Sequence, residues 1–459
     1  MRTRSREAVL VMACAAVFVV LVTALGIVTS TTGPAEVAVL VLGSSPAWLP
    51  TVALTAVAVL AALVLSPTLL LAGAVVAGHG LGIAALQEPL AGPLVISDLL
   101  LLAHLLASFA KQRIEKAALF APVCRWLGLF LAWSFLATAS AGAPITPLLR
   151  ISVYAAVFVL LSNHPIDRTL MYGAVLCYAL VNLVGGVLLG QSRLIGLDIG
   201  DPAQMGALLL AALCPLLTTE LRFTGRWVVG AMLLGGIFLT QTRSVWFATT
   251  VVLVVWAQRK VSLVRIGAIL LVLALLGLGT VDLVTRWFGL NPFSGDLRTL
   301  SMINGIHAGM QEPLFGAGWG RISFVDWAGA SVPPSPDPVM PYNLLVGVFA
   351  SVGLPAALLL LLFLGELLRR LAPQRGTPLL FTVGVLAMSL TEMTFYAGSM
   401  LTVLFFVYAG MGLGREPRGL GIDGTPTPYG VGTTGRCPPS TDHEASALPD
   451  ATRGAPALT

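Results

Sequence analysis

Charged residues are scarce in this sequence, and their scarcity argues against an ordinary soluble protein. Asp, Glu, Lys and Arg make up 10% of the 459 residues, against about 25% in soluble domains. Hydrophobic residues make up 57%, and the mean hydropathy is +0.91. Apolar runs approaching the ~20 residues that a bilayer-spanning helix needs follow one another along most of the chain. The sequence therefore predicts an all-α polytopic membrane protein.

Other features are missing as well. The apolar runs do not alternate with a period of two, so an outer-membrane barrel is not expected. The net charge is only +5 and comes from short basic clusters, which gives no basis for a nucleic-acid partner. Four of the five cysteines lie inside apolar runs and the fifth is near the C-terminus: Cys14, Cys124, Cys177, Cys214 and Cys437. No disulfide framework, metal site or cofactor is predicted from them.

The apolar runs and one long polar interruption divide the chain into four parts. Residues 1–283 are predicted to hold the N-terminal transmembrane helices, 284–340 a large loop, 341–414 the C-terminal transmembrane helices, and 415–459 a disordered tail. We expect roughly 12–14 transmembrane helices in total. The first apolar run, 8–28, is long for a signal peptide and is predicted to remain as the first helix.

The basic clusters predict the orientation in the membrane. They all fall in polar segments of the same parity: 111–116, 164–168, 222–226, 259–265 and 369–375. Because Lys and Arg concentrate on the cytoplasmic side, both termini are expected in the cytoplasm. The large loop is then extracytoplasmic, on the outer face of the cytoplasmic membrane.

A set of arginines falls on the side where this orientation expects few of them: Arg193, Arg243, Arg286, Arg298 and Arg321. A guanidinium suits phosphate because its planar fork donates two parallel hydrogen bonds and stays protonated. The set therefore predicts an anionic ligand. For any single arginine, an interfacial anchor or a loop salt bridge is the alternative.

Two short polar turns are candidate parts of such a site. In 191–210, Asp201 is predicted to cap a helix with Pro202 at its first position, whereas Arg193 has no comparable local role. In the segment TQTRSVW, Arg243 lies at the mouth of a tight helical hairpin. A helix beginning near Ser244 would add its N-terminal dipole to the arginine's charge, an arrangement that suits a diphosphate.

The large loop contains a predicted helix and a glycine-rich turn. Residues 297–311 can form the helix, in which His307 follows Arg298 by nine residues, about 180° around the axis. The two side chains could not then face one ligand directly. The glycines after Pro313 form a Gly-x-Gly-x-Gly run without the Gly-Lys-Ser/Thr of a P-loop, so a tight backbone turn is predicted.

The span after the loop is predicted to begin at Pro341, with Tyr342 and Asn343 at the membrane surface. An aromatic-belt anchor is the alternative role for Tyr342. Asp98 and Glu392 are the main acids expected inside the membrane, with Asp98 near a helix end. Glu392 can cap a helix or pair with an arginine at the outer mouth.

Taken in order, these segments resemble the O-antigen ligase and polymerase superfamily of bacterial membrane enzymes, which includes protein O-oligosaccharyltransferases. The resemblance rests on SRLIGLDIGDPAQMGALLL, TQTRSVWFA, PLFGAGWG, PYNLLVGVFASVGLP and the earlier ISDLLLL. It implies metal-independent glycan transfer outside the cytoplasmic membrane. The donor would be an oligosaccharide on undecaprenyl diphosphate, and the acceptor a glycan, a lipid or a protein.

The resemblance also implies roles for particular residues. Arg193 and Arg243 match the family's arginines best, and Arg298 matches a basic position at the start of the loop helix; they would stabilise the leaving diphosphate. The family usually has His-Asn where this chain has Tyr342-Asn343, and a tyrosine with a pKa near ~10 is a poor base at neutral pH. The predicted catalytic residues are Arg243, Arg298, Tyr342 and Asn343. The predicted substrate-binding residues are Arg193, Asp201, His307 and Arg321.

Two other classes of protein fit part of the pattern. A transporter or flippase of lipid-linked sugars would also need outward-facing arginines, but it should place ionisable groups near the middle of the membrane. No internal repeat supports this alternative. A non-catalytic protein of polysaccharide assembly is the third possibility.

Overall fold

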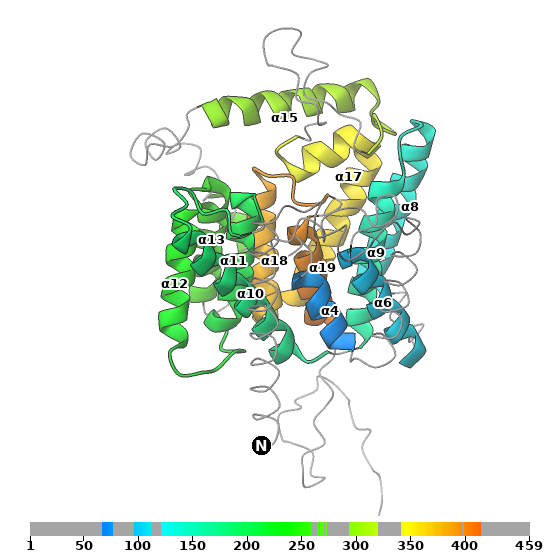
Figure 1. Cartoon of the computed structure of the whole chain (residues 1–459). Helices are drawn as coiled ribbons and strands as arrows, with labels where there is room; N and C mark the ends of the chain where they lie inside the picture. Colours follow the sequence, from blue (N-terminus) through cyan, green and yellow to red (C-terminus); the bar gives the residue numbers. More distant parts are fainter. Residues whose placement is uncertain are drawn as a thin grey trace, which may run out of the picture. The chain divides into compact units, whose positions relative to one another are not determined.

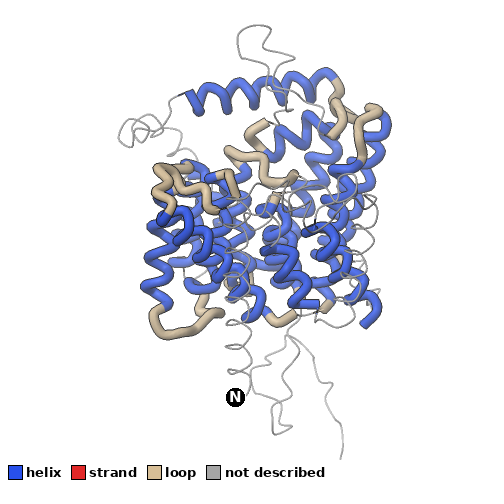
Figure 2. The backbone as a smooth tube through the Cα atoms, viewed as in Figure 1, coloured by secondary structure: helices blue, strands red, loops and turns tan. Residues whose placement is uncertain are grey.

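The computed structural model describes residues 67–76, 96–111, 121–164, 166–197, 199–258, 264–265, 267–269, 271–272, 293–319, 341–396 and 399–414. Within these ranges the regular elements are α-helices, as predicted, and no strand occurs (Figure 2). The predictions for the first helix, for Arg286 and Arg321, and for the tail 415–459 concern residues outside the described ranges.

The described helices are α4 (Pro67–Val76), α6 (Ile96–Lys111), α8 (Pro122–Ser140), α9 (Thr146–Asn163), α10 (Arg168–Leu188), α11 (Pro202–Leu217), α12 (Arg226–Leu239), α13 (Arg243–Ala257), α15 (Phe293–Gln311), α17 (Leu344–Leu371), α18 (Thr377–Ser389) and α19 (Met400–Leu413) (Figure 1). Among them, α8, α9, α10 and α17 are long and apolar enough to cross a membrane, and α11, α12, α13, α18 and α19 are shorter apolar helices. The total of roughly 12–14 spans stays a prediction.

The core of the described part is formed by helices that are apolar on all sides. α11 is buried throughout residues 205–217, and it packs against α10, α12, α13, α18 and α19. Outer helices expose large apolar side chains instead, including Leu136 on α8, Trp227 and Val228 on α12, and Leu358 on α17. A bilayer would cover such surfaces. The buried core helix and the exposed apolar surface therefore both agree with a membrane protein.

α15 lies crosswise to helices such as α8, α12 and α18, and packs against α17 (Figure 1). Its glycines make this close approach possible. A Cβ atom on Gly305 would lie 2.6 Å from Cγ of Pro341, and one on Gly309 would overlap the Phe349 ring. Small residues four positions apart on a helix form a flat strip on which a neighbouring segment can lie. This strip seats α15 on the first half of α17.

α17 is broken in its middle. Gly353 has a φ of 84° and a ψ of 173°, and Pro355 follows two residues later. Proline lacks an N–H, so the carbonyl of Ser351, four residues earlier, has no helical donor. A break of this kind inside an apolar helix is stable only if the carbonyls it releases find other donors.

The glycine-rich turn after α15 supplies two of these donors. The N–H groups of Ala317 and Gly318 donate to the carbonyls of Ala350 and Ser351 at 2.9 and 2.8 Å. In return, the Leu354 N–H donates to the Pro313 carbonyl at 2.8 Å. The predicted tight turn is confirmed, with φ of 65° at Gly316 and 95° at Gly318. Its contacts fix the end of α15 to the bend of α17.

α8 supplies a further donor to the same bend. The Trp133 indole Nε1 donates to the Val352 carbonyl at 3.1 Å, and its ring stacks on Phe315 of the glycine turn with centroids 5.4 Å apart. Trp319, at the end of the turn, is 1% exposed, and its N–H donates to Thr138 Oγ1 on α8. The bend is thus enclosed by α8 and the turn, which gives the segments beside it a rigid base.

Candidate functional site

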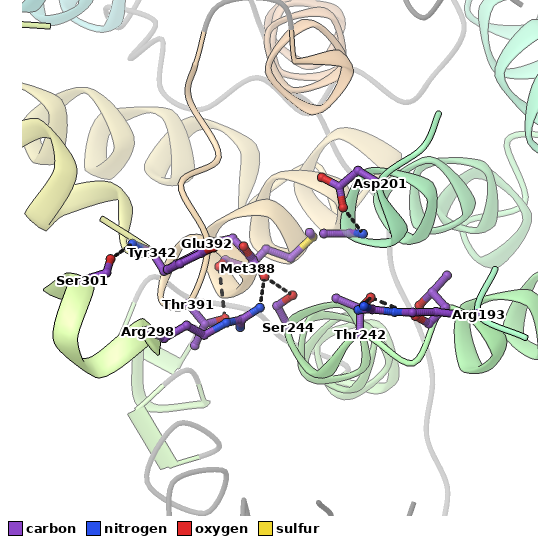
Figure 3. Close-up of polar contacts among 12 residues, drawn as sticks. Arg193, Asp201, Thr242, Ser244, Arg298, Ser301, Tyr342, Met388, Thr391 and Glu392 are labelled. Carbon is purple, nitrogen blue, oxygen red and sulfur yellow. Dashed lines mark hydrogen bonds and ion pairs between the residues drawn. The ribbon is translucent and has the colours of Figure 1, made fainter. Parts of the chain in front are cut away.

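An ion pair joins the loop helix to the segment after α18 (Figure 3). Arg298 Nη2 on α15 lies 2.5 Å from Glu392 Oε1. The Ser244 hydroxyl, at the start of α13, donates to the same carboxylate oxygen at 3.1 Å. The side chains of Arg298 and Glu392 are 27% and 15% exposed, so the pair is sheltered but still reachable. Three segments far apart in the sequence therefore meet at one carboxylate.

Tyr342 also contacts this arginine. The guanidinium carbon of Arg298 is 5.3 Å from the centroid of the Tyr342 ring, within the range of a cation–π contact. The Tyr342 backbone N–H donates to Ser301 Oγ on α15 at 3.0 Å. Arg298 thus contacts both a ring and a carboxylate, which limits the directions in which its guanidinium can point.

Asn343 begins α17, and this corrects the predicted start at Pro341. The first helical residue is Leu344, and the Asn343 Oδ1 accepts from the N–H groups of Leu345 and Val346. Its Nδ2 donates to the Leu390 carbonyl at 3.0 Å. Pro341 suits a first helical position, but asparagine at the cap satisfies two N–H groups that proline cannot. Asn343 thereby ties the start of α17 to the end of α18.

Arg193 has a local role that the sequence did not indicate, so the expectation that it lacked one was wrong. Its Nε donates to the Thr240 carbonyl at 2.9 Å, and its Nη2 lies 3.3 Å from Thr242 Oγ1. These acceptors form the turn between α12 and α13. The Gln241 amide donates back to the Ser192 carbonyl at 3.2 Å, which closes the contact between the two turns.

Arg243 is the first residue of α13, close to the predicted helix start near Ser244. Thr242 is the N-cap, but its side chain makes no capping hydrogen bond to this helix. Its hydroxyl instead donates to the Thr240 carbonyl and accepts from Arg193 Nη2. A helix N-terminus carries a partial positive charge that adds to that of an arginine there. Arg193 braces the turn that presents Arg243, so the two predicted arginines belong to one structural unit.

Asp201 is the N-cap of α11, with Pro202 as the first helical residue, as predicted. Its Oδ1 accepts from the Ala203 N–H at 2.8 Å. One residue further into the helix, Gln204 donates to the Tyr396 hydroxyl at 2.7 Å. Burial raises the pKa of Tyr396 to about 12, so this hydroxyl stays protonated at neutral pH. The start of α11 is thus anchored to the segment that carries Glu392.

Glu392 was expected inside the membrane, but it lies in the segment that follows α18, because this helix ends at Ser389. The predicted pairing with an arginine at a helix mouth is confirmed by the contact with Arg298. Burial raises the pKa of Glu392, and the negative charge of Asp201 acts in the same direction. Arg298 and the Ser244 hydrogen bond oppose this rise because both favour the carboxylate.

Of the remaining predicted residues, His307 is not brought to this cluster. His307 is exposed on α15, nine residues from Arg298, as expected for opposite sides of a continuous helix. Arg321 belongs to the part of the chain that is not described. Within the described ranges, no group of three or more His, Cys, Asp or Glu side chains is placed to hold a metal ion. Asp98 lies in the first turn of α6.

Sequence reasoning missed two contributors, Ser244 and Ser301. Ser244 occupies the second position of α13, where a hydroxyl can point away from its own helix toward a neighbouring element. Ser301 follows Arg298 by three residues and therefore shares its face of α15. This spacing could have marked Ser301, whereas nothing local marks Ser244 as the partner of a carboxylate in a distant segment.

Comparison with known families identifies the region that holds most of these residues. Residues 228–361 match the O-antigen ligase family. The matched stretch runs from α12 into α17 and contains Arg243, Arg298 and Tyr342, whereas Arg193 and Glu392 lie outside it. Among curated proteins, none matches the chain. The resemblance to the O-antigen ligase superfamily, predicted from the motifs, is confirmed.

Proposed function

We propose that this chain, which carries an O-antigen ligase domain, is a membrane glycosyltransferase acting on an undecaprenyl-diphosphate-linked donor. It would move or polymerise the glycan at the extracytoplasmic face of the cytoplasmic membrane. The main support for the proposal is that the residues of the cluster lie largely within the stretch that matches the family. The family match covers α13, α15 and the start of α17, the elements whose ends bring Arg298 and Tyr342 together beside Ser244.

The reaction requires stabilisation of a leaving diphosphate. An acceptor hydroxyl attacks the anomeric carbon, the bond from that carbon to the diphosphate oxygen breaks, and negative charge develops on the lipid diphosphate. Arginines placed beforehand at this point stabilise the developing charge. We assign this role to Arg243 and Arg298, and we assign substrate binding to Arg193, Asp201, His307 and Arg321.

Tyr342 and Asn343 complete the proposed site. The Tyr342 ring faces the Arg298 guanidinium and can stack against a sugar, while its hydroxyl can donate a hydrogen bond to the donor. Asn343 holds the start of α17 in place through its cap and its contact with the Leu390 carbonyl. The acceptor would be a glycan, a lipid or a protein, and the bilayer supplies the donor.

Transfer in proteoliposomes tests the proposal. Wild type is given an undecaprenyl-diphosphate oligosaccharide and candidate acceptors, and both glycan transfer and release of undecaprenyl diphosphate are measured. Arg243→Ala should lower the rate by about 100-fold or more, the usual cost of removing a group that stabilises developing charge. Tyr342→Phe shows how much of the rate depends on the phenol hydroxyl.

Arg222→Ala is the matched control. Arg222 is exposed after α11 and donates to the nearby Thr219 carbonyl, away from the cluster at Glu392. This control should transfer glycan at the wild-type rate. Movement of lipid-linked sugar between leaflets without release of undecaprenyl diphosphate would replace the proposal by a transporter. Absence of both activities across a panel of donors would favour a non-catalytic assembly protein.

A further inference from the structure

We propose that Glu392 is the general base that takes the proton from the acceptor hydroxyl, an inference that rests on the proposed glycosyl transfer. The family match ends at residue 361, so Glu392 lies outside it. Glu392 is instead brought to the cluster by the fold, which places its carboxylate in contact with Arg298 and Ser244 (Figure 3).

The backbone around Glu392 is held firmly enough to aim the side chain. The N–H groups of Thr391 and Glu392 both donate to the Met388 carbonyl, each at 2.9 Å. One residue earlier, the Leu390 carbonyl accepts from the Asn343 amide. Glu392 therefore leaves the end of α18 in a turn that is attached both to its own helix and to the start of α17.

The two side-chain contacts of the carboxylate use the same oxygen. The hydrogen bonds from Arg298 and Ser244 both reach Oε1. Among the described residues Oε2 accepts none, and the side chain is 15% exposed. A general base must come within hydrogen-bond reach of the proton it removes. We therefore assign this role to Oε2, for an acceptor that enters beside Arg298.

The surroundings suit a base at neutral pH. Burial raises the pKa of Glu392, which makes the carboxylate more basic than an exposed one, while Arg298 and Ser244 keep the ionised form stable. The charged and titratable groups that act on it are Arg298 on α15, Asp201 at the start of α11 and Tyr396 on its own segment, with Tyr342 beside Arg298. Arg243 directly precedes Ser244, whose hydroxyl reaches the carboxylate.

The other nearby candidates are poorer bases. A tyrosine hydroxyl such as that of Tyr342 is a weak base at neutral pH because it must first lose a proton with a pKa near ~10. His307 is exposed on α15, nine residues from the arginine that faces the cluster. Among the described groups, Glu392 is a carboxyl group that is sheltered from solvent and contacts a proposed diphosphate-binding arginine.

The transfer is a single displacement at the anomeric carbon. The acceptor oxygen forms a bond to the anomeric carbon while its proton moves to Glu392 Oε2. The bond between the anomeric carbon and the diphosphate oxygen breaks, and its electron pair leaves with the diphosphate beside the arginines. Glu392 then returns the proton to water, and no oxidant, reductant or metal ion is consumed.

A purely structural ion pair is the competing explanation, and the variants must separate the two roles. Glu392→Gln keeps the shape and can still accept from Ser244, but it cannot take a proton. Glu392→Asp keeps the charge and withdraws the carboxylate by one methylene. Glu366→Gln is the matched control, because Glu366 pairs with Arg369 and Arg370 near the opposite end of α17.

The measurements are the transfer rate across a pH series, the KM for the donor and thermal unfolding. Glu392→Gln should lower kcat by about 100-fold or more and leave the donor KM within a few-fold, because general-base catalysis supplies 10²–10⁴-fold. The acid limb of the rate profile should disappear with it. Glu392→Asp should retain the limb at a reduced rate, and Glu366→Gln should match wild type in both.

A wild-type pH profile in Glu392→Gln, or a rate loss that only follows its loss of folded protein, would overturn the inference. If Glu392→Gln does not fold, the profile of Glu392→Asp decides: an acid limb unchanged in position and rate would equally count against Glu392. Failure of the proposed function looks different, because wild type itself would then transfer no glycan.

Discussion

Gly318 donates its N–H to the carbonyl of Ser351, the acceptor that Pro355 leaves without a helical donor. The glycine-rich run after α15 and the broken middle of α17 are thus two halves of one structure. In a membrane, an unsatisfied carbonyl costs several kcal/mol, so the pairing is required for the bend to exist. This contact explains why a phosphate-loop-like glycine run occurs here without the residues that bind a nucleotide.

Replacing Gly353 by alanine should destabilise the protein strongly. A residue other than glycine at its φ of 84° is strained by about 1–3 kcal/mol, and the new methyl would also overlap the Leu314 carbonyl. Gly365→Ala, later on the same helix, meets open space and should be neutral or mildly stabilising. Thermal unfolding in one detergent compares them, and equal melting temperatures would contradict the role given to Gly353.

Two changes at Asn343 should separate its two contacts. Asn343→Asp keeps the oxygen that accepts from Leu345 and Val346 but loses the donor to the Leu390 carbonyl. Asn343→Ala loses both and should cost about 1–2 kcal/mol from the missing cap alone. Stability should therefore fall in the order wild type, Asp, Ala. Hydrogen exchange at Val346 reports the cap directly, and equal exchange in all three proteins would argue against it.

Arg193 should not tolerate lysine. Its Nε and Nη2 reach two acceptors, Thr240 and Thr242, and a lysine ammonium on a flexible stem cannot reproduce that fork. We expect Arg193→Lys to loosen the turn that presents Arg243 and to lower the transfer rate about tenfold. Arg222→Lys, with the same chemical change away from the site, should leave the rate intact. A fully active Arg193→Lys would show that the turn needs no brace.

Removing the charge of Asp201 should shift the pH dependence of transfer to lower pH. Burial is the main cause of the raised Glu392 pKa, and the negative charge of Asp201 adds to it. In Asp201→Asn the neighbouring charge is gone, so the carboxylate becomes easier to form and its pKa falls. The base then stays ionised further into acid, and the acid limb moves down.

Asp201→Asn changes the charge but can keep the helix cap, and Asp201→Ala is the structural control for it. Asparagine can still accept from the Ala203 N–H, so α11 should remain capped and the melting temperature should change little. Asp201→Ala loses the cap as well as the charge and should be less stable by about 1 kcal/mol. An acid limb that moves up, or that stays in place in Asp201→Asn, would contradict the coupling to Glu392.

The features predicted correctly from the sequence depend on neighbouring residues. Asp201 and Pro202 mark the start of α11 because a cap and its helix are adjacent, and the turn before α13 was evident from the polar residues around Arg243. The start at Pro341 was wrong because two capping signals compete within three residues. Asn343 prevails there, since it satisfies N–H groups of the first turn.

The contacts that build the candidate site could not be predicted in this way. Arg298 and Glu392 are 94 residues apart, and their meeting depends on where α15 and α18 end relative to each other. Arg193 is separated from Thr240 by 47 residues, and no local pattern distinguishes a brace from a ligand-binding arginine. Periodicity and capping rules describe single elements, whereas these pairs depend on how the elements pack.

The shared hydrogen bonds of the glycine turn and the α17 bend also limit how the chain can be recombined. A chimaera that takes its glycine turn from one protein and its α17 from another would align the N–H groups at 317 and 318 with the carbonyls at 350 and 351 only if both parents have the same turn and the same bend. Such a hybrid should fold only if the boundaries carry both segments together. The glycine turn and the bend of α17 must therefore be exchanged as a pair.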